Sequence, residues 1–412
     1  MSSIKKEAER CLRCKKALCS EHCPVATPVP QITELFLNGE IKKAGELLFN
    51  NNPISAVTSL ICPHEKNCTG HCVLGRKGAP VEFYRIEQYI SRFYLETMEI
   101  PEIKRNGIKV AVAGAGPAGI TMTILMLLHG YDVTLFESED DIGGVLRYGI
   151  PPFRLPRDLL DLLKDIMLRM GVRFRPNTRI GSNIMIEDLF PDGYKAVFVS
   201  TGTGRPRKLG LVGETLGHVH FAIDYLKSPY SFRLGRRVVI VGAGNVAIDV
   251  ARTAIRCGHS YVKILHYMGK DDMTANHDEV EMAEIDGVEF IHNVQAVRIT
   301  EDAVRCVHVE RTENPDGTLS FEEDYSQVID VPADSVIIAI GQGPSADIIS
   351  AGVKLTQRGL FDVNEWGETD RPGVFAAGDI VSGPKTVVDA VAFTKKVFVR
   401  MEEYLEEQTK TK

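Results

Sequence analysis

Two glycine-rich turns, each directly after a short β-branched run, limit the fold of this chain more than any other feature. They read Val110-Ala-Val-Ala-Gly114-Ala-Gly116-Pro-Ala-Gly119 and Val238-Val-Ile-Val-Gly242-Ala-Gly244-Asn-Val-Ala247. In a strand–turn–helix unit of this kind the glycines let the backbone approach a pyrophosphate held at the helix N-terminus. Because the turns recur 128 residues apart, the sequence predicts one nucleotide-binding module used twice.

The rest of the chain after residue 105 alternates short β-branched runs with longer helical stretches. The runs are Ile108–Ala113, Val133–Phe136, Val197–Ser200, Val238–Val241, Val262–Leu265 and Val336–Ile340. This alternation is typical of α/β units around parallel sheets. A linker-like stretch precedes Arg236, and the second module is expected to end near Gly341. We therefore expect one nucleotide-binding domain in residues 106–230 and 341–412, interrupted by a second in residues 231–340.

The N-terminal region is set apart by its cysteines, since seven of nine precede residue 73. They are spaced as Cys11-x2-Cys14-x4-Cys19-x3-Cys23-Pro24 and Cys62-Pro63-x4-Cys68-x3-Cys72. Apolar spacing predicts helices from Ile32 to Phe49, interrupted at Asn38-Gly39, and from Ile86 to Tyr94. Residues 1–105 should thus form a small helical domain.

Thiolates at these short intervals suit either an iron–sulfur cubane or zinc. Seven cysteines with one oxygen or nitrogen donor nearly fill the eight ligand positions of two cubanes, which favours clusters. His22, His64 and His71 lie among the cysteines but are better explained as ordinary polar residues. Zinc remains the alternative.

Composition excludes several other functions. A net charge of −7 gives no support to nucleic-acid binding. The longest apolar run, Ala118 to Leu128, is too short to span a bilayer, and the polar first ten residues lack a signal-peptide core. We expect a cytoplasmic protein in which the cysteines hold metal or do redox chemistry rather than form disulfides.

Further motifs indicate that the first nucleotide is FAD. Glu137 ends the next strand, 18 residues after Gly119, where it can accept the ribose hydroxyls. Gly144 follows in Ile142-Gly143-Gly144, Gly378-Asp379 ends a late strand, and Thr386 begins a helix whose N-terminus can face the flavin ring. Two dinucleotide sites imply hydride transfer between cofactors, so no side-chain nucleophile is required. No catalytic role is expected for His218, His220, His259, His266, His277 or His292.

This order of motifs resembles the family of bacterial glutamate synthase small subunits, dihydropyrimidine dehydrogenase NAD-dependent subunits and the large subunit of bifurcating NADH-dependent ferredoxin:NADP reductase. The resemblance rests on the cysteine spacing and on three segments, Gly149-Ile-Pro-Pro-Phe-Arg154-Leu-Pro, Gly242-Ala-Gly-Asn-Val-Ala-Ile-Asp249 and Ala377-Gly-Asp379-Ile-Val-Ser-Gly-Pro-Lys385-Thr386. It implies an α/β fold of the glutathione-reductase type, with a helical iron–sulfur domain before two Rossmann-like domains and the NAD domain inserted in the FAD domain.

The resemblance also implies two [4Fe–4S] clusters with interleaved ligands. Cys11, Cys14, Cys19 and Cys72 would hold one, and Cys23, Cys62, Cys68 and a non-cysteine ligand the other. That last ligand falls on Glu87, with Gln88 as the fallback, and Arg154 matches an arginine that contacts the flavin.

The nicotinamide domain departs from NADP-using members of the family, which carry paired arginines after its second strand. Here the stretch reads His266-Tyr267-Met268-Gly269-Lys270-Asp271-Asp272, so NADH is favoured over NADPH, although Lys270 could meet a phosphate. The residues expected to bind NADH are Gly242, Gly244, Asn245, Ala247, Tyr267 and Gly341. Cys257 and Cys306 lie 49 residues apart and form no disulfide-reductase pair, so both are expected to be structural.

The expected function is electron input: hydride passes from NADH to FAD, and single electrons pass through the clusters to a partner subunit that carries the terminal active site. That partner would decide between glutamate synthesis, pyrimidine reduction and ferredoxin reduction with bifurcation. The alternatives are a free-standing NADH diaphorase whose N-terminal domain binds zinc, and a non-catalytic flavoprotein scaffold.

Overall fold

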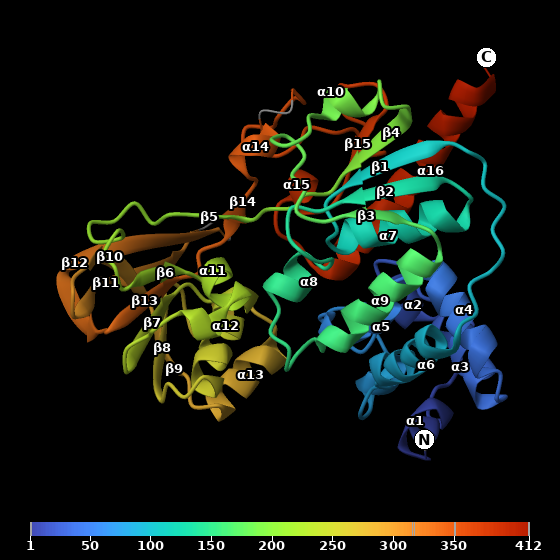
Figure 1. Cartoon of the computed structure of the whole chain (residues 1–412). Helices are drawn as coiled ribbons and strands as arrows, with labels where there is room; N and C mark the ends of the chain where they lie inside the picture. The colour runs from blue at the N-terminus through green and yellow to red at the C-terminus, as the bar shows by residue number, and fades with distance from the viewer. Residues whose placement is uncertain (1, 315, 317, 350–351, 411–412) are drawn as a thin grey trace. The chain divides into compact units, whose positions relative to one another are not determined.

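A computed structural model of the chain describes residues 2–314, 316, 318–349 and 352–410. The chain divides into two compact units (Figure 1). The first comprises Met1–Arg147, Pro152–Thr203 and Pro344–Lys412, and the second Tyr148–Pro151 and Gly204–Gly343. Within the described residues no helix is both long and apolar enough to span a bilayer.

The first unit begins with a group of helices. They are α1 (Ser2–Glu9), α2 (Leu18–Glu21), α3 (Val29–Leu37), α4 (Ile41–Asn51), α5 (Ser55–Ile61), the 3-10 helix η1 (Val73–Arg76) and α6 (Phe83–Thr97). Ile32, Leu48, Ile86 and Ile90 are fully buried in their shared core. The chain breaks between α3 and α4 because Gly39 adopts φ +81°, a conformation that favours glycine. The predicted helices and their interruption are confirmed.

The same unit contains a five-stranded parallel sheet in the order β15-β4-β1-β2-β3. Its strands are β1 (Lys109–Ala113), β2 (Asp132–Phe136), β3 (Arg173–Arg175), β4 (Tyr194–Val199) and β15 (Val374–Ala376). Its helices are α7 (Pro117–Leu128), α8 (Val145–Tyr148), α9 (Arg157–Arg169), α10 (Ile186–Leu189), α14 (Ala346–Ile349), α15 (Asp379–Ser382) and α16 (Val387–Lys410). Ten of the twelve residues of α7 are buried, because α7 packs against β1, β2 and β4 and also against α16.

The second unit contains another five-stranded parallel sheet, in the order β6-β13-β7-β8-β9. These strands are β6 (Val219–Phe221), β7 (Arg237–Val241), β8 (Tyr261–His266), β9 (Glu289–His292) and β13 (Ser335–Ile338). The helices are α11 (Ala222–Lys227), η2 (Pro229–Ser231), α12 (Asn245–Arg256), η3 (Lys270–Asp272) and α13 (His277–Ile285). The parallel α/β arrangement predicted for both modules is confirmed. Strand β6 lies before residue 231, the predicted start of the second domain, and the boundaries remain predictions.

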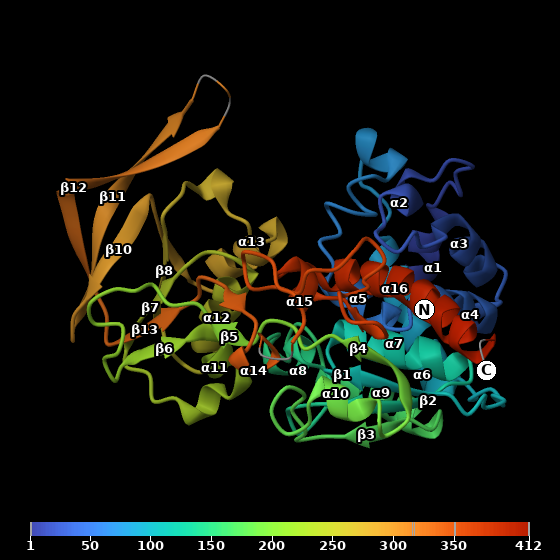
Figure 2. The same ribbon diagram turned by 90° about the horizontal axis from the view of Figure 1, so that it is seen from above.

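Two smaller sheets complete the second unit. Strands β10 (Val294–Ile299), β11 (Ala303–Glu313) and β12 (Leu319–Pro332) form an antiparallel sheet, visible side by side in Figure 2. The short strands β5 (Arg205–Pro206) and β14 (Gln342–Gly343) pair antiparallel. Cys306 is fully buried in the core beneath β11, and all nine cysteines are free thiols.

Candidate cofactor sites

The first glycine turn joins β1 to α7, and two of its three glycines leave no room for a side chain. Gly114 adopts φ +96°, and a Cβ atom there would lie 2.6 Å from the carbonyl oxygen of Ser200. A Cβ on Gly119 would lie only 1.8 Å from the carbonyl oxygen of Gly114. A Cβ on Gly116 would instead meet nothing within 4 Å. The turn therefore presents open backbone at the N-terminus of α7, which is the cradle that a pyrophosphate requires.

Glu137 lies at the end of β2 beside this turn and is 6% exposed. Its Oε2 accepts a hydrogen bond of 2.7 Å from the backbone N–H of Ala115. Its Oε1 accepts from the Ser138 hydroxyl at 3.0 Å and from the Glu139 N–H at 2.9 Å. These bonds fix the carboxylate next to the turn, where it can accept hydroxyls of a ribose.

Two segments distant in sequence meet the same turn. Gly144 has φ +52°, and its Cβ would lie 2.9 Å from the Cα of Gly116. Gly378 has φ +78°, and its Cβ would lie 3.3 Å from the Cβ of Ala118. Arg154 is partly buried on the stretch between α8 and α9. The structure thus brings three of the predicted FAD motifs to one end of α7.

Asp379 and Thr386 both precede α16, and Thr386 stands directly before its first residue. Burial raises the pKa of Asp379 to about 6, while the backbone N–H of Lys385, which donates to Asp379 at 3.4 Å, acts in the opposite direction. The Thr386 hydroxyl donates to Asp389 at 2.5 Å, and the Asp389 N–H donates back to Thr386 at 3.2 Å. This reciprocal pair caps the first turn of α16. The donor set, the open turn and the fixed acid together fit a bound dinucleotide.

The second glycine turn repeats the first in the other unit. Gly242 has φ +114°, and a Cβ there would lie 2.5 Å from the carbonyl oxygen of Ala339. Ala247, in the place of the third glycine, is fully buried. Gly244 is open, since a Cβ there would meet only the Thr274 hydroxyl at 3.6 Å. Gly341 has φ +100°, and Tyr267 is 44% exposed with its ring 5.6 Å from that of Phe321.

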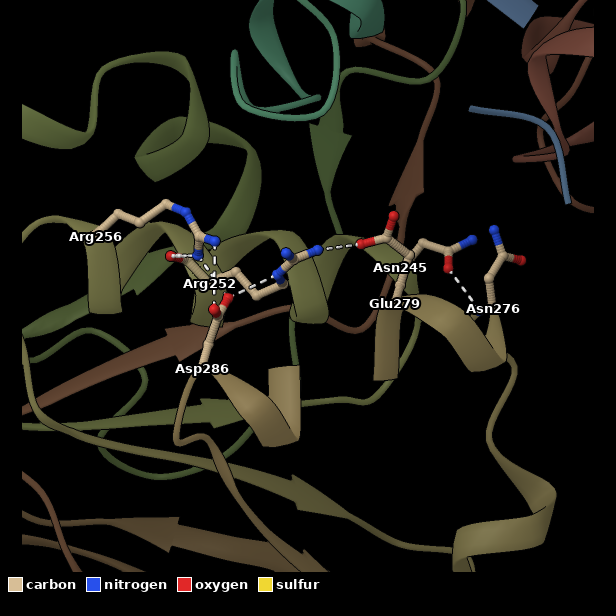
Figure 3. A network of polar contacts seen from close by, with 6 residues as sticks. All are labelled: Asn245, Arg252, Arg256, Asn276, Glu279 and Asp286. Atoms are coloured by element: carbon tan, nitrogen blue, oxygen red, sulfur yellow. Dashed lines mark hydrogen bonds and ion pairs between the residues drawn. The ribbon is translucent and has the colours of Figure 1, made fainter. Parts of the chain in front are cut away.

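Polar contacts fix the helix that follows this turn (Figure 3). Asn245 Oδ1 accepts from the Asn276 N–H at 2.9 Å. Arg252, 5% exposed, pairs with Glu279 at 2.5 Å and with Asp286 at 2.9 Å, and Arg256 pairs with Asp286 at 2.6 Å. Burial alone would raise the pKa of Asp286, but the two guanidinium groups hold it below its usual value. The network ties α12 to α13 and so holds Asn276 against the turn.

One group of thiols lines a pocket in the N-terminal helices. The pocket is lined by Cys11, Cys14, Cys19 and Cys72, and Cys68 of the second group also reaches its wall. The pKa of Cys19 is raised to about 11, chiefly by burial and then by the neighbouring Cys11 and Cys72. Cys72, the last cysteine of the region, therefore lies with the first ones.

A second group combines Cys23, Cys62, Cys68 and Glu87. Burial raises the pKa of Cys62, with further contributions from Glu87, Cys23 and Cys68. Burial followed by Glu87 raises the pKa of Cys68 to about 12. Burial raises the pKa of Glu87 to about 8. A buried carboxylate among buried thiols is a set of anionic donors that fits an iron–sulfur cluster.

Neither group has its donor atoms arranged around a single point. Among the described residues, no three Cys, His, Asp or Glu side chains converge as ligands of one metal ion would. The four ligands of a cubane bind four different irons, so they surround the cluster without meeting at a point.

One contact beside the second group was not predicted from the sequence. The Nζ atom of Lys395, on α16, donates to Asn51 Oδ1 at 2.7 Å and to the carbonyl oxygen of Val25 at 3.4 Å. The Thr27 hydroxyl lies 3.3 Å from the sulfur of Cys23. No sequence signal links Lys395 to these residues, because it lies 370 residues after Val25.

Comparison with known proteins agrees with this geometry. Residues 108–393 match the family model described as pyridine nucleotide-disulphide oxidoreductase. Residues 1–99 match the model for dihydropyrimidine dehydrogenase domain II, 4Fe-4S cluster.

Two curated relatives match over nearly the whole chain. The glutamate synthase [NADPH] small chain of Escherichia coli is 33% identical, over 95% of this chain and 89% of that protein. The NAD-dependent dihydropyrimidine dehydrogenase subunit PreT of Salmonella typhimurium is 34% identical, over 98% of this chain and 94% of that protein.

Solved structures show the same fold at lower identity. FprA of Mycobacterium tuberculosis in complex with NADPH superposes with a TM-score of 0.64 at 16% identity, over 74% of this chain and 86% of that one. Thioredoxin reductase of T. acidophilum superposes with a TM-score of 0.53 at 24% identity, over 72% of this chain and 98% of that one. The two domain matches identify an FAD-dependent oxidoreductase with an N-terminal 4Fe-4S domain. The chain therefore belongs to the pyridine nucleotide-disulphide oxidoreductase family, alongside glutamate synthase small chains and NAD-dependent dihydropyrimidine dehydrogenase subunits.

Proposed function

We propose that this chain is the electron-input subunit of a larger redox enzyme, which takes hydride from NADH onto FAD and passes single electrons through two [4Fe–4S] clusters to a partner subunit. The observation that carries the proposal is the separation of the cysteines into two groups, in the same compact unit as the first glycine turn. Two clusters beside a flavin suit the conversion of a two-electron donor into one-electron steps.

In this proposal the chain's own residues bind and orient the cofactors. Backbone groups of Gly114, Gly116 and Gly119 hold the pyrophosphate of FAD at the start of α7, and Glu137 accepts the ribose hydroxyls. Gly144, Arg154, Gly378, Asp379 and Thr386 contact the remainder of the flavin nucleotide. When bound, FAD supplies the hydride acceptor, which protein side chains cannot provide.

Each group of thiols is assigned one cluster. Cys11, Cys14, Cys19 and Cys72 hold the first, and Cys23, Cys62, Cys68 and Glu87 hold the second. The pKa of every thiol whose shift is resolved in these groups lies above its ordinary value because of burial, so the thiolates need positive iron to be stable. We place the domains at residues 1–105 for the clusters, 106–230 with 341–412 for FAD, and 231–340 for NADH.

The second turn is assigned to NADH rather than NADPH. Gly242, Gly244, Asn245, Ala247, Tyr267 and Gly341 would surround it. Two cations lie near the end of β8, and each already has a carboxylate partner: Lys270 pairs with Glu284 at 2.6 Å, and Arg311 with Asp272 at 3.3 Å. A 2′-phosphate would have to displace these carboxylates, and it would lack the bidentate arginine grip that suits phosphate.

The partner subunit carries the terminal active site in this proposal. The two curated relatives are named for glutamate synthase and for dihydropyrimidine dehydrogenase, and they are a small chain and a subunit respectively. We infer that the net reaction of the complex is set by the partner.

Metal and flavin analysis of anaerobically purified protein tests the proposal. We expect about eight irons and one FAD per chain, and bleaching of the visible absorbance on addition of NADH but much less with NADPH. Zinc without iron would overturn the cluster assignment and leave an NADH diaphorase. Absence of both FAD and NADH oxidation would leave only a scaffold.

A further inference from the structure

Helix α16 reaches from the candidate flavin site to the second cysteine group. It begins at Val387, directly after Thr386, and Asp389 in its first turn contributes to the raised pKa of Cys62. Lys395 follows eight residues after Val387, which is about 12 Å along a helix that rises 1.5 Å per residue. One helix therefore runs beside the second cysteine group from its first turn to Lys395.

Lys395 contacts the segment that carries a proposed cluster ligand. Val25, whose carbonyl oxygen accepts from Lys395, is two residues after Cys23. Asn51, the second acceptor, ends α4. The amide nitrogen of Asn51 is buried and has no hydrogen-bond partner among the described residues. The side-chain oxygen of Asn51 thus accepts a hydrogen bond from the ammonium group of Lys395, whereas its side-chain nitrogen donates none among the described residues.

The ammonium group of Lys395 lies near one thiol of the second group, Cys23. Burial lowers the pKa of Lys395, and the neighbouring Cys23 acts in the opposite direction. No ion pair joins Lys395 to an acid in the part of the chain that the structure describes. A half-buried cation next to an anionic ligand set interacts with it more strongly than a surface cation would, because the local dielectric is lower.

We propose that Lys395 is a positioning residue that places a fixed positive charge beside the cluster of Cys23, Cys62, Cys68 and Glu87 and raises its reduction potential. The inference rests on the proposed function, because it requires that this site hold a cluster. Reduction adds one negative charge to the cluster, and a nearby cation stabilises the charge-rich form. With both groups bound, a reduced flavin would supply the one electron that an oxidised cluster accepts, and Lys395 would form no bond and release no proton.

The test is a redox titration of the holoenzyme followed by electron paramagnetic resonance. Lys395→Gln retains a hydrogen-bond donor for Val25 and Asn51 but removes the charge, and Lys395→Arg retains the charge. We expect Lys395→Gln to shift the one-electron equilibrium of this cluster about tenfold toward the oxidised form, which is about 59 mV. Lys395→Arg should stay near the wild-type potential. Glu87→Cys, which alters only this ligand set, identifies the signal that belongs to the site.

The neighbouring lysine supplies a matched control. Lys396 follows on the same helix, but its side chain is 39% exposed, pairs with Glu365 at 3.4 Å and lies 4.4 Å from the centre of the Trp366 ring. Lys396→Gln removes the same charge one residue away and should leave the potential unchanged. An equal shift in Lys396→Gln, or none in a fully loaded Lys395→Gln, would overturn the inference.

A second variant tests the role of the charge without replacing Lys395. Asn51→Asp keeps Lys395 and gives it a carboxylate partner, so the potential should again fall, with iron and FAD content unchanged. An unchanged potential in this variant would also overturn the role of the charge. If wild-type protein shows no iron–sulfur signal, the proposed function fails and this inference with it, whereas unchanged potentials in loaded variants refute only the inference.

Discussion

The two glycine turns share their backbone and differ in what surrounds it. In both, the first glycine has a positive φ, +96° at Gly114 and +114° at Gly242. In both, the N–H of this glycine donates to a carbonyl oxygen at the end of the neighbouring strand. The acceptor is Phe136, the last residue of β2, at 2.8 Å in the first turn, and Leu265, the next-to-last residue of β8, at 3.0 Å in the second. The backbone geometry of the module is therefore the same in the two units.

The surroundings decide what each turn can bind. Beside the first, Glu137 accepts three hydrogen bonds and Gly144 and Gly378 close in from distant segments. Beside the second, the strand ends in His266, which is 4% exposed, and the turn is supported by Asn276. Distant segments thus meet the first turn through Gly144 and Gly378, whereas Ala339 and Asn276 meet the second.

The largest effect is expected from Gly119→Ala. The new methyl group would lie 1.8 Å from the Gly114 carbonyl oxygen and 2.9 Å from the Ser200 hydroxyl, so α7 must move away from β1. We expect loss of bound FAD and a fall of about 3 kcal/mol or more in the free energy of unfolding. Flavin absorbance and urea denaturation measure both. Full FAD occupancy at wild-type stability would show that the close helix–strand approach is unnecessary.

Glu137→Leu should have the next largest effect. It removes the acceptor for the N–H of Ala115 and Glu139 and for the proposed ribose hydroxyls, in a site that is almost closed to water. Lost hydrogen bonds to a buried charged group cost about 1.5–3 kcal/mol, so FAD affinity should fall roughly 10-fold to 100-fold. Reconstitution of the apoprotein with FAD measures it. Asp132→Asn, at the opposite end of β2, is the control, and an equal loss there would contradict a specific role for Glu137.

These residues also show how far the sequence alone could go. The turns, the flanking strands and the helix break at Gly39 could be predicted because each depends on local pattern and on a few glycines. The β10-β11-β12 sheet could not, since Val331 is the one buried residue of β12 and the strand shows no apolar alternation. A strand of that kind is specified by its partner rather than by its own pattern.

The cofactor sites divide in the same way. Glu137 could be predicted because its distance from the turn is fixed by a strand and a helix. The grouping of Cys72 with Cys11 was implied only by the family resemblance, because cysteine spacing does not report which thiols meet in space. Lys395 gave no signal at all, since its contact with Val25 joins opposite ends of the chain.

A moderate effect is expected when the cations near the second site are released. In Asp272→Ala/Glu284→Ala, Arg311 and Lys270 lose their partners and become available to a 2′-phosphate. Exposed pairs of this kind contribute about 0.2–1 kcal/mol each, so the KM for NADPH should fall roughly fivefold while that for NADH stays constant. Steady-state kinetics with an artificial acceptor measure both. Glu289→Gln, which frees Lys263 on the same sheet, should change neither, and a gain there would point to net charge alone.

The smallest effect on nucleotide binding is expected from Ala247→Gly, which restores the third glycine of the second turn. Ala247 is fully buried, so its methyl group already fits between α12 and the sheet, and its removal opens space without moving the backbone. Loss of the methyl contacts and of helix propensity should cost about 2 kcal/mol of unfolding free energy. Because Gly242 and Gly244 are unchanged, the KM for NADH should stay within roughly twofold of wild type, less than 0.5 kcal/mol. A large rise in KM at unchanged FAD content would show that the second turn depends on the same close packing as the first.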